Sequence, residues 1–320
     1  MGELVVEQRF YPVESLDNSS RWKPACLNDI LYSEIERQVC HPMRNVKIVA
    51  DSSANLMSLN TVAFDAAPLK IITAQREFVD DRNLDLNEMI AYFKSYKGRS
   101  QSSCPNPEDW LATFGDADAV FCVAITSGLS GSYNAACIAK EMYEAEHPGR
   151  RVFVIDSLSA GPELTLLVEK LEELIAAGKS FEEICAYMPE YQKKTGLLFM
   201  LESLNNFAAN GRVSPAVAKI AGVLGIRIVG KASDAGTLEP TDKCRGESKS
   251  LNAILKHLKD SGLKTGKVQL AHCQNETAAN TLKSMIETEL PGVTVKIGIN
   301  LGLCSFYAEK GGLLVGFEKN

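Results

Sequence analysis

The stretch FCVAITSGLSGSYNAA, residues 121–136, combines three local patterns that together predict an α/β fold. An apolar run rich in β-branched residues ends at Thr126, and a helical pattern begins at Tyr133 and extends to about Glu146. Serine and glycine fill most of the turn between them. In a parallel sheet such a turn lies at the carboxyl edge, where α/β proteins bind their ligands. Hydroxyl and backbone N–H groups in this turn can hold an oxygen anion at the start of the helix.

Two further predicted strands end in the same kind of turn. The strand Val46–Ala50 is followed by Asp51–Ser53, and a later strand ends in Asp156–Ser159. Serine, threonine and aspartate also cap helices, so capping alone explains any one of these turns. Three such turns in one sheet, with Ser102 and Ser103 in a polar loop, favour a binding site for a polar ligand.

Predicted strands alternate with helices of about 10–15 residues, which favours parallel βαβ units. A predicted hairpin, Lys231–Lys243 with its turn at Asp234–Gly236, breaks this pattern in the C-terminal third. Residues 98–107 are expected to form a polar loop. The helices are expected at Leu86–Tyr96, Pro107–Phe114, Tyr133–Glu146, Glu163–Ala176, Phe181–Lys193, Ser248–Lys259 and Glu276–Leu290.

We therefore expect an α/β protein with two α/β domains after an N-terminal extension, residues 1–45, that contains a helix at Leu27–Val39. Residues 46–210 are expected to form a mainly parallel sheet with flanking helices. Residues 211–320 are expected to form a mixed sheet with helices. A ligand cleft between two such domains is a common arrangement.

The composition is that of a globular protein and argues against several classes of partner. Of the 320 residues, 45% are hydrophobic and 23% are charged, as in typical soluble domains. The net charge of −6 and the lack of a long basic block argue against nucleic acid as a partner. No apolar run reaches the length of about 20 residues that a membrane span requires. The acidic N-terminus, interrupted by Pro12 and Pro24, does not have the pattern of a signal peptide.

The cysteines and histidines point to a reduced compartment and to no metal. The nine cysteines are odd in number and contain no CxxC pair, which favours reduced thiols in the cytoplasm. The four histidines, at positions 41, 147, 257 and 272, are not spaced as metal ligands. The nucleotide-binding patterns GxxxxGK[ST] and GxGxxG are absent, so we expect no cofactor.

Ser130 also raises the possibility of an enzyme. In a hydrolase nucleophile elbow a glycine lies two residues on either side of the serine. Gly128 fits this pattern, but Ser132 occupies the second position. A catalytic base would have to be His257 or His272. A serine-dependent hydrolase or acyl-transfer enzyme is therefore the alternative to a binding protein, and a regulatory module with an empty cleft is a third hypothesis.

Several motifs together resemble the DegV family of bacterial fatty-acid-binding proteins, and the similarity extends from Val46 to Phe317. The turn ITSGLSGSYNAA is close to the family pattern SSxLSGTY, and SSCPNPEDW, residues 102–110, is similar to TSxPSP. The other segments that carry the resemblance are KIVADSSANL at residues 47–56, VIDSLSAGPELTLLV at residues 154–168 and LNNFAANGRVSP at residues 204–215.

The resemblance implies a lipid tunnel between two α/β domains and a long-chain fatty acid bound in it. Ser102 matches the threonine of the TSxPS motif and Ser130 the serine of the LSGT motif, so these two are the implied carboxylate ligands. Ser103 and the backbone N–H of Gly131 are expected to support them. The family further implies a carrier without catalytic activity, which presents the acid to a separate dihydroxyacetone-kinase-like subunit that makes acyl phosphate.

The chain departs from the family near its C-terminus, where many members have a histidine that helps to bind the carboxylate. Alignment of GLCSFYAEKGG places Tyr307 at this position, and a tyrosine hydroxyl can donate to a carboxylate. Ser305 is the alternative. Arg212, which follows Gly211 at a predicted helix end, is expected to contact the kinase or the phosphate. Residues 1–45 have no recognised counterpart in the family.

A fatty acid also suits the physical properties of these motifs. Burial of roughly fourteen methylenes at about 0.8 kcal/mol each gives on the order of 11 kcal/mol before the costs of binding. Apart from Arg99 at the edge of the polar loop, the serine-rich turns contain no lysine or arginine. We therefore expect a neutral cradle of hydroxyl and N–H groups. The candidates for the apolar lining, each of which could equally be plain core, are Leu197–Leu201, Ala216–Leu224, Ile226 and Ile228.

Overall fold

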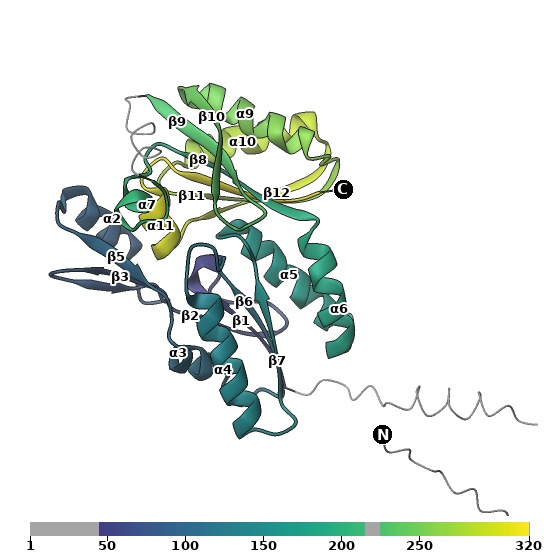
Figure 1. The fold of residues 1–320 in the computed structure, drawn as a ribbon. Helices are drawn as coiled ribbons and strands as arrows, with labels where there is room; N and C mark the ends of the chain where they lie inside the picture. The colour runs from purple at the N-terminus through teal and green to yellow at the C-terminus, as the bar shows by residue number, and fades with distance from the viewer. Residues whose placement is uncertain (1–44, 215–224, 320) are drawn as a thin grey trace, which may run out of the picture. The chain divides into compact units, whose positions relative to one another are not determined.

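The N-terminal part of the described chain is built on a parallel sheet of four strands (Figure 1). The structure is a computed structural model that describes residues 45–214 and 225–319. The strand order is β2-β1-β6-β7, and all neighbours are parallel. The bounds are β1 Val46–Asp51, β2 Ala63–Ala67, β6 Ala119–Ala124 and β7 Arg151–Asp156.

Helices cover both faces of this sheet, which explains why its central strands read as continuous apolar runs. On one face, Phe121 and Val123 pack with residues of α5 (Pro162–Ala176) and α6 (Phe181–Gln192). On the other face, Val120 and Cys122 pack with residues of α3 (Pro107–Phe114) and α4 (Ser132–Glu146). The expected parallel α/β arrangement is confirmed.

The C-terminal part forms a mixed sheet of six strands in the order β10-β9-β8-β13-β11-β12. Only β11 and β12 are parallel neighbours, and the expected mixed sheet is confirmed. Helices α9 (Glu247–Asp260) and α10 (Glu276–Glu289) cover one face. The strands are β8 Thr195–Leu201, β9 Ile226–Ala232, β10 Leu238–Arg245, β11 Thr265–His272, β12 Gly292–Ile299 and β13 Leu313–Glu318.

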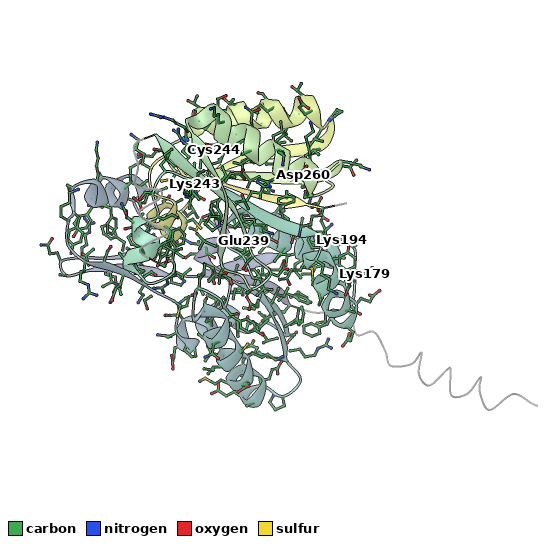
Figure 2. The ribbon with its side chains drawn as sticks, turned by 45° about the horizontal axis from the view of Figure 1, so that its top comes forward. Lys179, Lys194, Glu239, Lys243, Cys244 and Asp260 are labelled. Carbon is green, nitrogen blue, oxygen red and sulfur yellow. The ribbon has the colours of Figure 1, made fainter. Side chains whose placement is uncertain are left out.

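Strand β10 forms one edge of the mixed sheet and shows how its two faces differ. Cys244 packs against the cluster beneath α9, whereas its neighbour Lys243 is exposed (Figure 2). Charged side chains on an edge strand oppose pairing with other chains.

Strand β8 lies within this sheet, between β13 and β9, although it precedes residue 211. The division into domains at residues 46–210 and 211–320 stays a prediction.

A third, smaller sheet has the order β4-β3-β5 and is antiparallel. Its strands are β3 Lys70–Thr73, β4 Glu77–Val79 and β5 Ser100–Ser103, and α2 (Leu86–Ser95) follows β4. The expectation that residues 98–107 form only a loop is wrong, because Ser100–Ser103 pair with β3. This strand is all serine and glutamine, so no apolar alternation marks it.

The seven predicted helices that fall on described residues agree with the structure to within one residue at each end. The predicted hairpin Lys231–Lys243 is longer in the structure, where it extends from Ile226 to Arg245. The predicted helix end before Arg212 corresponds to the short helix α7 (Asn205–Ala209). Helix α11 (Gly302–Ala308), the single turn η1 (Ser52–Ala54) and strand β4 were not predicted. The expected helix Leu27–Val39 and the apolar stretch Ala216–Leu224 lie outside the described residues.

Candidate functional site

A cavity of about 320 Å³ is lined by residues of the mixed sheet and the small antiparallel sheet, by helix α11 and by the turns that follow β6 and β7 of the parallel sheet. Its volume is at the lower end of the range typical of small-molecule sites. The residues that line it are Leu69, Ser102, Ser103, Cys104, Ile125, Thr126, Leu129, Ser130, Gly131, Ser159, Ala160, Leu197, Phe199, Leu201, Phe207, Arg212, Ala232, Gly236, Thr237, Leu238, Leu303, Cys304, Tyr307, Ala308 and Leu314. All six residues predicted from the sequence to contact the ligand or a partner are among them.

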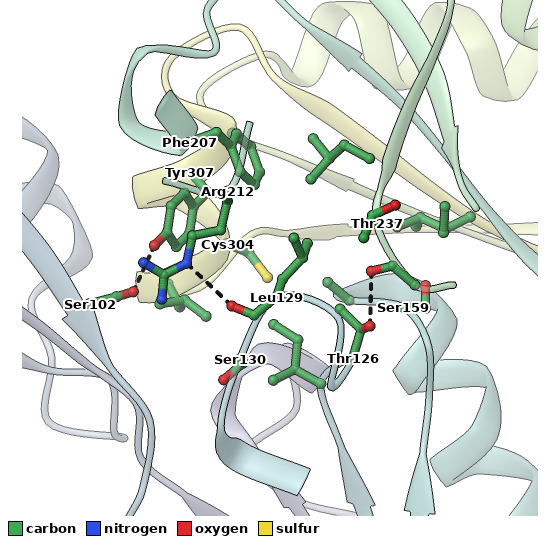
Figure 3. A pocket seen from close by; sticks show the side chains of 18 of the residues that line it. Ser102, Thr126, Leu129, Ser130, Ser159, Phe207, Arg212, Thr237, Cys304 and Tyr307 are labelled. Atoms are coloured by element: carbon green, nitrogen blue, oxygen red, sulfur yellow. Dashed lines mark hydrogen bonds between the residues drawn. The ribbon is translucent and has the colours of Figure 1, made fainter. Parts of the chain in front are cut away.

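Ser102, Tyr307 and Arg212 lie together at one side of the cavity (Figure 3). The hydroxyl oxygens of Ser102 and Tyr307 are 2.7 Å apart and share a hydrogen bond. Burial raises the pKa of Tyr307, and the hydrogen bond with Ser102 and the charge of Arg212 act in the opposite direction. The Arg212 guanidinium is therefore close enough to the hydroxyl pair to influence it electrostatically.

Arg212 also joins this side of the cavity to the serine-rich turn. Its Nε donates to the carbonyl oxygen of Leu129 at 3.2 Å (Figure 3), and its Nη1 donates to the carbonyl oxygen of Asn210 at 2.5 Å. The expectation of a cradle without cations is therefore wrong. Arg212 is distant in sequence from the serine-rich turns, so their local composition could not reveal it.

Of the two candidates for the family histidine, only Tyr307 lines the cavity. Ser305 is buried, and its hydroxyl donates to the carbonyl oxygen of Asn300 at 2.6 Å. Both residues lie on α11, two positions apart, so they point to different sides of this short helix. Ser103 lines the cavity beside Ser102, and its hydroxyl donates to the carbonyl oxygen of Cys104 at 3.3 Å.

Ser130 and Gly131 lie at the N-terminus of α4, where backbone N–H groups favour an anion. The N-cap residue of this helix is Gly131, which has no side chain to form a cap. The Ser130 hydroxyl oxygen accepts a hydrogen bond from the backbone N–H of Ser132 at 3.2 Å. This contact uses an acceptor site of Ser130 and leaves its proton for donation to another group. A side chain at Gly131 would place its Cβ 3.3 Å from the sulfur of Cys104.

Only two of the three serine-rich turns reach the cavity. The turn after β6 contributes several lining residues, and the turn after β7 contributes Ser159. Ser52 and Ser53, after β1, are buried and do not line the cavity. Their hydroxyls bond instead to the backbone N–H of Leu69 and to the Asp51 carboxylate. The first turn thus bonds to a lining residue, Leu69, without lining the cavity itself.

Asp80 fixes the start of α11, the helix that carries Tyr307. Its two carboxylate oxygens accept from the backbone N–H groups of Gly302 and Leu303, each at 2.8 Å. Burial raises the pKa of the Asp80 carboxyl to about 6, although hydrogen bonds from Leu303, Ser52 and Gly302 favour its charged form. A distant aspartate thus supplies the cap that the sequence of α11 lacks.

The rest of the cavity wall is mainly apolar. Leu197, Phe199 and Leu201 alternate along β8 and line the cavity, so three of the five residues predicted as candidates on this strand are confirmed. Leu198 and Met200, on the opposite face, pack in the cluster beneath α9 and α10. Ile226 and Ile228, also predicted to line a tunnel, are not among the lining residues.

The hairpin between β9 and β10 closes the cavity against the serine-rich turn. Thr126 Oγ1 donates to the carbonyl oxygen of Gly236 at 2.9 Å (Figure 3). A Cβ at Gly128 would lie 2.6 Å from the carbonyl oxygen of Ala235. Gly236 has a φ of +70°, and a Cβ there would lie 2.0 Å from Thr126 Oγ1. The close approach of these two loops therefore requires glycine on both sides.

The geometry does not favour Ser130 as a hydrolase nucleophile. Neither candidate base, His257 nor His272, lines the cavity. His257 lies on α9 and bonds instead to Asp242 of β10 at 2.6 Å. Among residues 45–214 and 225–319, no cluster of His, Cys, Asp or Glu could hold a metal ion. Within the same ranges, none of the helices is long and apolar enough to cross a membrane.

Comparison with known proteins gives consistent matches over the described chain. Residues 45–319 match the model of the DegV family, which is described as a family of uncharacterised proteins. A DegV domain-containing protein of Streptococcus pneumoniae is 45% identical over 276 residues, which are 85% of this chain and 98% of the relative.

Two solved structures are also similar to this chain. One is a DegV family protein from Eubacterium eligens loaded with heptadecanoic acid. It has a TM-score of 0.84 and 43% identity, over 86% of this chain and 100% of that one. The other is the fatty acid kinase (Fak) B3 protein of Streptococcus pneumoniae loaded with linoleic acid. It has a TM-score of 0.85 and 43% identity, over 87% of this chain and 100% of that one.

Asp80 is expected to make the free energy of unfolding depend on pH, and the direction of this dependence follows from its pKa. Because its pKa is higher in the folded than in the unfolded chain, the stability it contributes is complete below about pH 3.8 and is lost as the pH rises through about 6. We expect the unfolding free energy of the wild type, relative to Asp80→Asn, to fall by about 2 kcal/mol between about pH 4.5 and 7.5. Urea unfolding at each pH measures this difference.

Glu172→Gln serves as a control of opposite sign. Burial alone would raise the pKa of Glu172. Hydrogen bonds from the backbone and hydroxyl of Thr61 and from the backbone of Asn60 together lower the pKa by more than burial raises it, so the net shift is downward. The stability that Glu172 contributes is therefore lost as the pH falls. If the unfolding free energy of the wild type relative to Asp80→Asn stays constant or increases with rising pH, the assigned role of Asp80 is contradicted.

Proposed function

The chain belongs to the DegV family, as its motifs predicted, and we propose that it binds a long-chain fatty acid in the cavity and acts as a carrier rather than as an enzyme. The observation that carries this proposal is the amphipathic lining of the cavity. The hydroxyls of Ser102 and Tyr307 lie with Arg212 at one side, and leucine and phenylalanine side chains form much of the wall between them and the hydroxyls of Thr126, Ser159 and Thr237 at the other side. The fatty acids in the two similar solved structures support this class of ligand.

The ligand carboxylate is proposed to bind between Ser102 and Ser130. The hydrogen bond between Ser102 and Tyr307 uses one of their two hydroxyl protons and leaves the other for the ligand. Ser130 and the N–H of Gly131 approach from the start of α4, and Ser103 supports Ser102. Arg212 supplies a positive charge, and charged groups strengthen hydrogen bonds to a carboxylate. The cavity thus offers both neutral and charged donors to the acid.

The apolar wall supplies most of the proposed binding free energy. Each methylene buried against side chains such as Leu197 and Phe199 contributes about 0.8 kcal/mol. No cofactor is required for binding of this kind. We further propose that the carrier works in the cytoplasm, a location supported by seven free cysteines among the described residues.

Replacement of Ser130 tests the carboxylate site. We expect Ser130→Ala to weaken binding of palmitic acid about tenfold, because one hydrogen bond to a charged group is lost, and to leave the unfolding temperature unchanged. Ser284→Ala, on the exposed face of α10, is the matched control and should bind as the wild type does. Equal affinity of the wild type and Ser130→Ala would contradict the assignment. Labelling of Ser130 by a fluorophosphonate probe would support the hydrolase alternative instead.

We also propose that the bound acid is presented to a separate kinase subunit, with Arg212 as the contact for that partner or for the transferred phosphate. The similarity to the Fak B3 protein supports this role. Arg212 suits it because a guanidinium binds phosphate through two parallel hydrogen bonds.

A reconstituted reaction tests the partnership. The lipid-loaded protein, a bacterial fatty acid kinase catalytic subunit, ATP and Mg²⁺ are mixed, and acyl phosphate is measured. We expect product from the wild type and at least tenfold less from Arg212→Ala at equal lipid occupancy, because the phosphate contact is lost. The streptococcal Fak B3 protein serves as the positive control. Product with Fak B3 but none with this chain would contradict the proposed partnership.

A further inference from the structure

Asp51 lies at the end of β1 and is fully buried behind the serine-rich turn. Its Oδ2 accepts from the backbone N–H of Ile125 at 2.8 Å and from the hydroxyl of Ser132 at 2.7 Å. These two donors stand at the two ends of the segment that contains Ser130. A single carboxylate oxygen therefore fixes both ends of the turn that lines the cavity.

A further hydrogen bond transmits this constraint to Ser130. The backbone N–H of Ser132 donates to the Ser130 hydroxyl oxygen at 3.2 Å. Because the Ser132 side chain is held by Asp51, its backbone N–H is held in place as well. The contacts run from Asp51 to Ser132 and from Ser132 to Ser130, and they set the direction in which Ser130 can donate its proton.

Capping of η1 explains only half of the contacts of Asp51. Its Oδ1 accepts from the backbone N–H and the hydroxyl of Ser53, at 3.2 and 2.5 Å, and this oxygen would be enough for a cap. Four donors in all converge on the two oxygens. An ionised carboxylate accepts from all four, whereas an asparagine would turn its NH₂ group towards two of them.

The burial of Asp51 is costly in itself. Burial raises its pKa, and its hydrogen bonds act in the opposite direction. Buried charges are generally retained only where they are well bonded. Ser53, Ile125 and Ser132 supply those bonds here, and two of the three lie in the segment that carries the candidate ligand-binding groups.

We propose that Asp51 is a positioning residue for the head group of the ligand, which acts through Ser132 to orient the Ser130 hydroxyl and the start of α4 towards the carboxylate. This inference rests on the proposed function, because it assigns Asp51 a role in recognition of the acid end of the ligand. It predicts that Asp51 matters for the carboxylate and much less for the alkyl chain.

The experiment compares palmitic acid with methyl palmitate, which has the same chain but a neutral head group. Binding of each to the full-length wild type and to Asp51→Asn is measured by displacement of a fluorescent lipid. We expect Asp51→Asn to weaken binding of the acid about tenfold and binding of the ester less than threefold, because charge-assisted hydrogen bonds are stronger than neutral ones. A merely structural role of Asp51 would weaken both by the same factor.

Two further variants distinguish a specific effect on the carboxylate from a general loss of the fold. Ser132→Ala removes one of the four donors to Asp51 but keeps the backbone N–H that bonds Ser130. It should also weaken binding of the acid more than binding of the ester, but by less than Asp51→Asn does. Asp65→Asn, on the neighbouring strand β2, is the matched control because its carboxylate pairs with Lys47 instead. Its ratio of acid to ester affinity should equal that of the wild type.

A double-mutant cycle locates the effect at Ser130. In a Ser130→Ala background, Asp51→Asn should change the ratio of acid to ester affinity less than it does in the wild type, because the Ser130 hydroxyl is gone and only the start of α4 is left to orient. An undiminished change of this ratio in that background, or equal loss of acid and ester binding in the single variant, would overturn the proposal while the proposed function stands. If the wild type bound neither lipid, the proposed function itself would fail, and the role of Asp51 with it.

Discussion

Two buried carboxylates, Asp51 and Asp80, hold the parts of the chain that carry the candidate head-group residues. Each must find hydrogen-bond donors because an unpaired buried charge is very costly. Asp51 finds them at Ile125 and Ser132, and Asp80 finds them at the start of α11. The turn with Ser130 and the helix with Tyr307 are thereby fixed to the first strand and to the segment after β4, before any ligand is present.

The mixed sheet supplies the other half of the site through the alternation of its strands. Strand β8 gives Leu198 and Met200 to the cluster beneath α9 and α10 and turns Leu197, Phe199 and Leu201 towards the cavity. The β9–β10 hairpin then reaches the serine-rich turn, where Thr126 donates to Gly236. The apolar wall of the cavity therefore depends on contacts between segments that are far apart in the sequence.

The sequence was enough to predict the parallel sheet, because the runs around β1, β6 and β7 are apolar and each is followed by a helix with clear periodicity. It also indicated the turn that contains Ser130, whose composition is unusual. It could not reveal β5, because a strand of serine and glutamine has no apolar alternation. The cap of α11 by Asp80, the place of Tyr307 rather than Ser305 on the cavity and the approach of Arg212 are tertiary contacts without a local pattern.

The most direct test of the account is to purify the protein without added lipid, denature it, extract it with organic solvent and identify the extracted molecules by mass spectrometry. An apolar cavity with a polar side should retain its ligand through purification, because burial of each methylene adds about 0.8 kcal/mol. We predict about one long-chain fatty acid for each chain. An extract without fatty acid, from protein shown to be folded, would contradict the central claim that this cavity is a fatty-acid site.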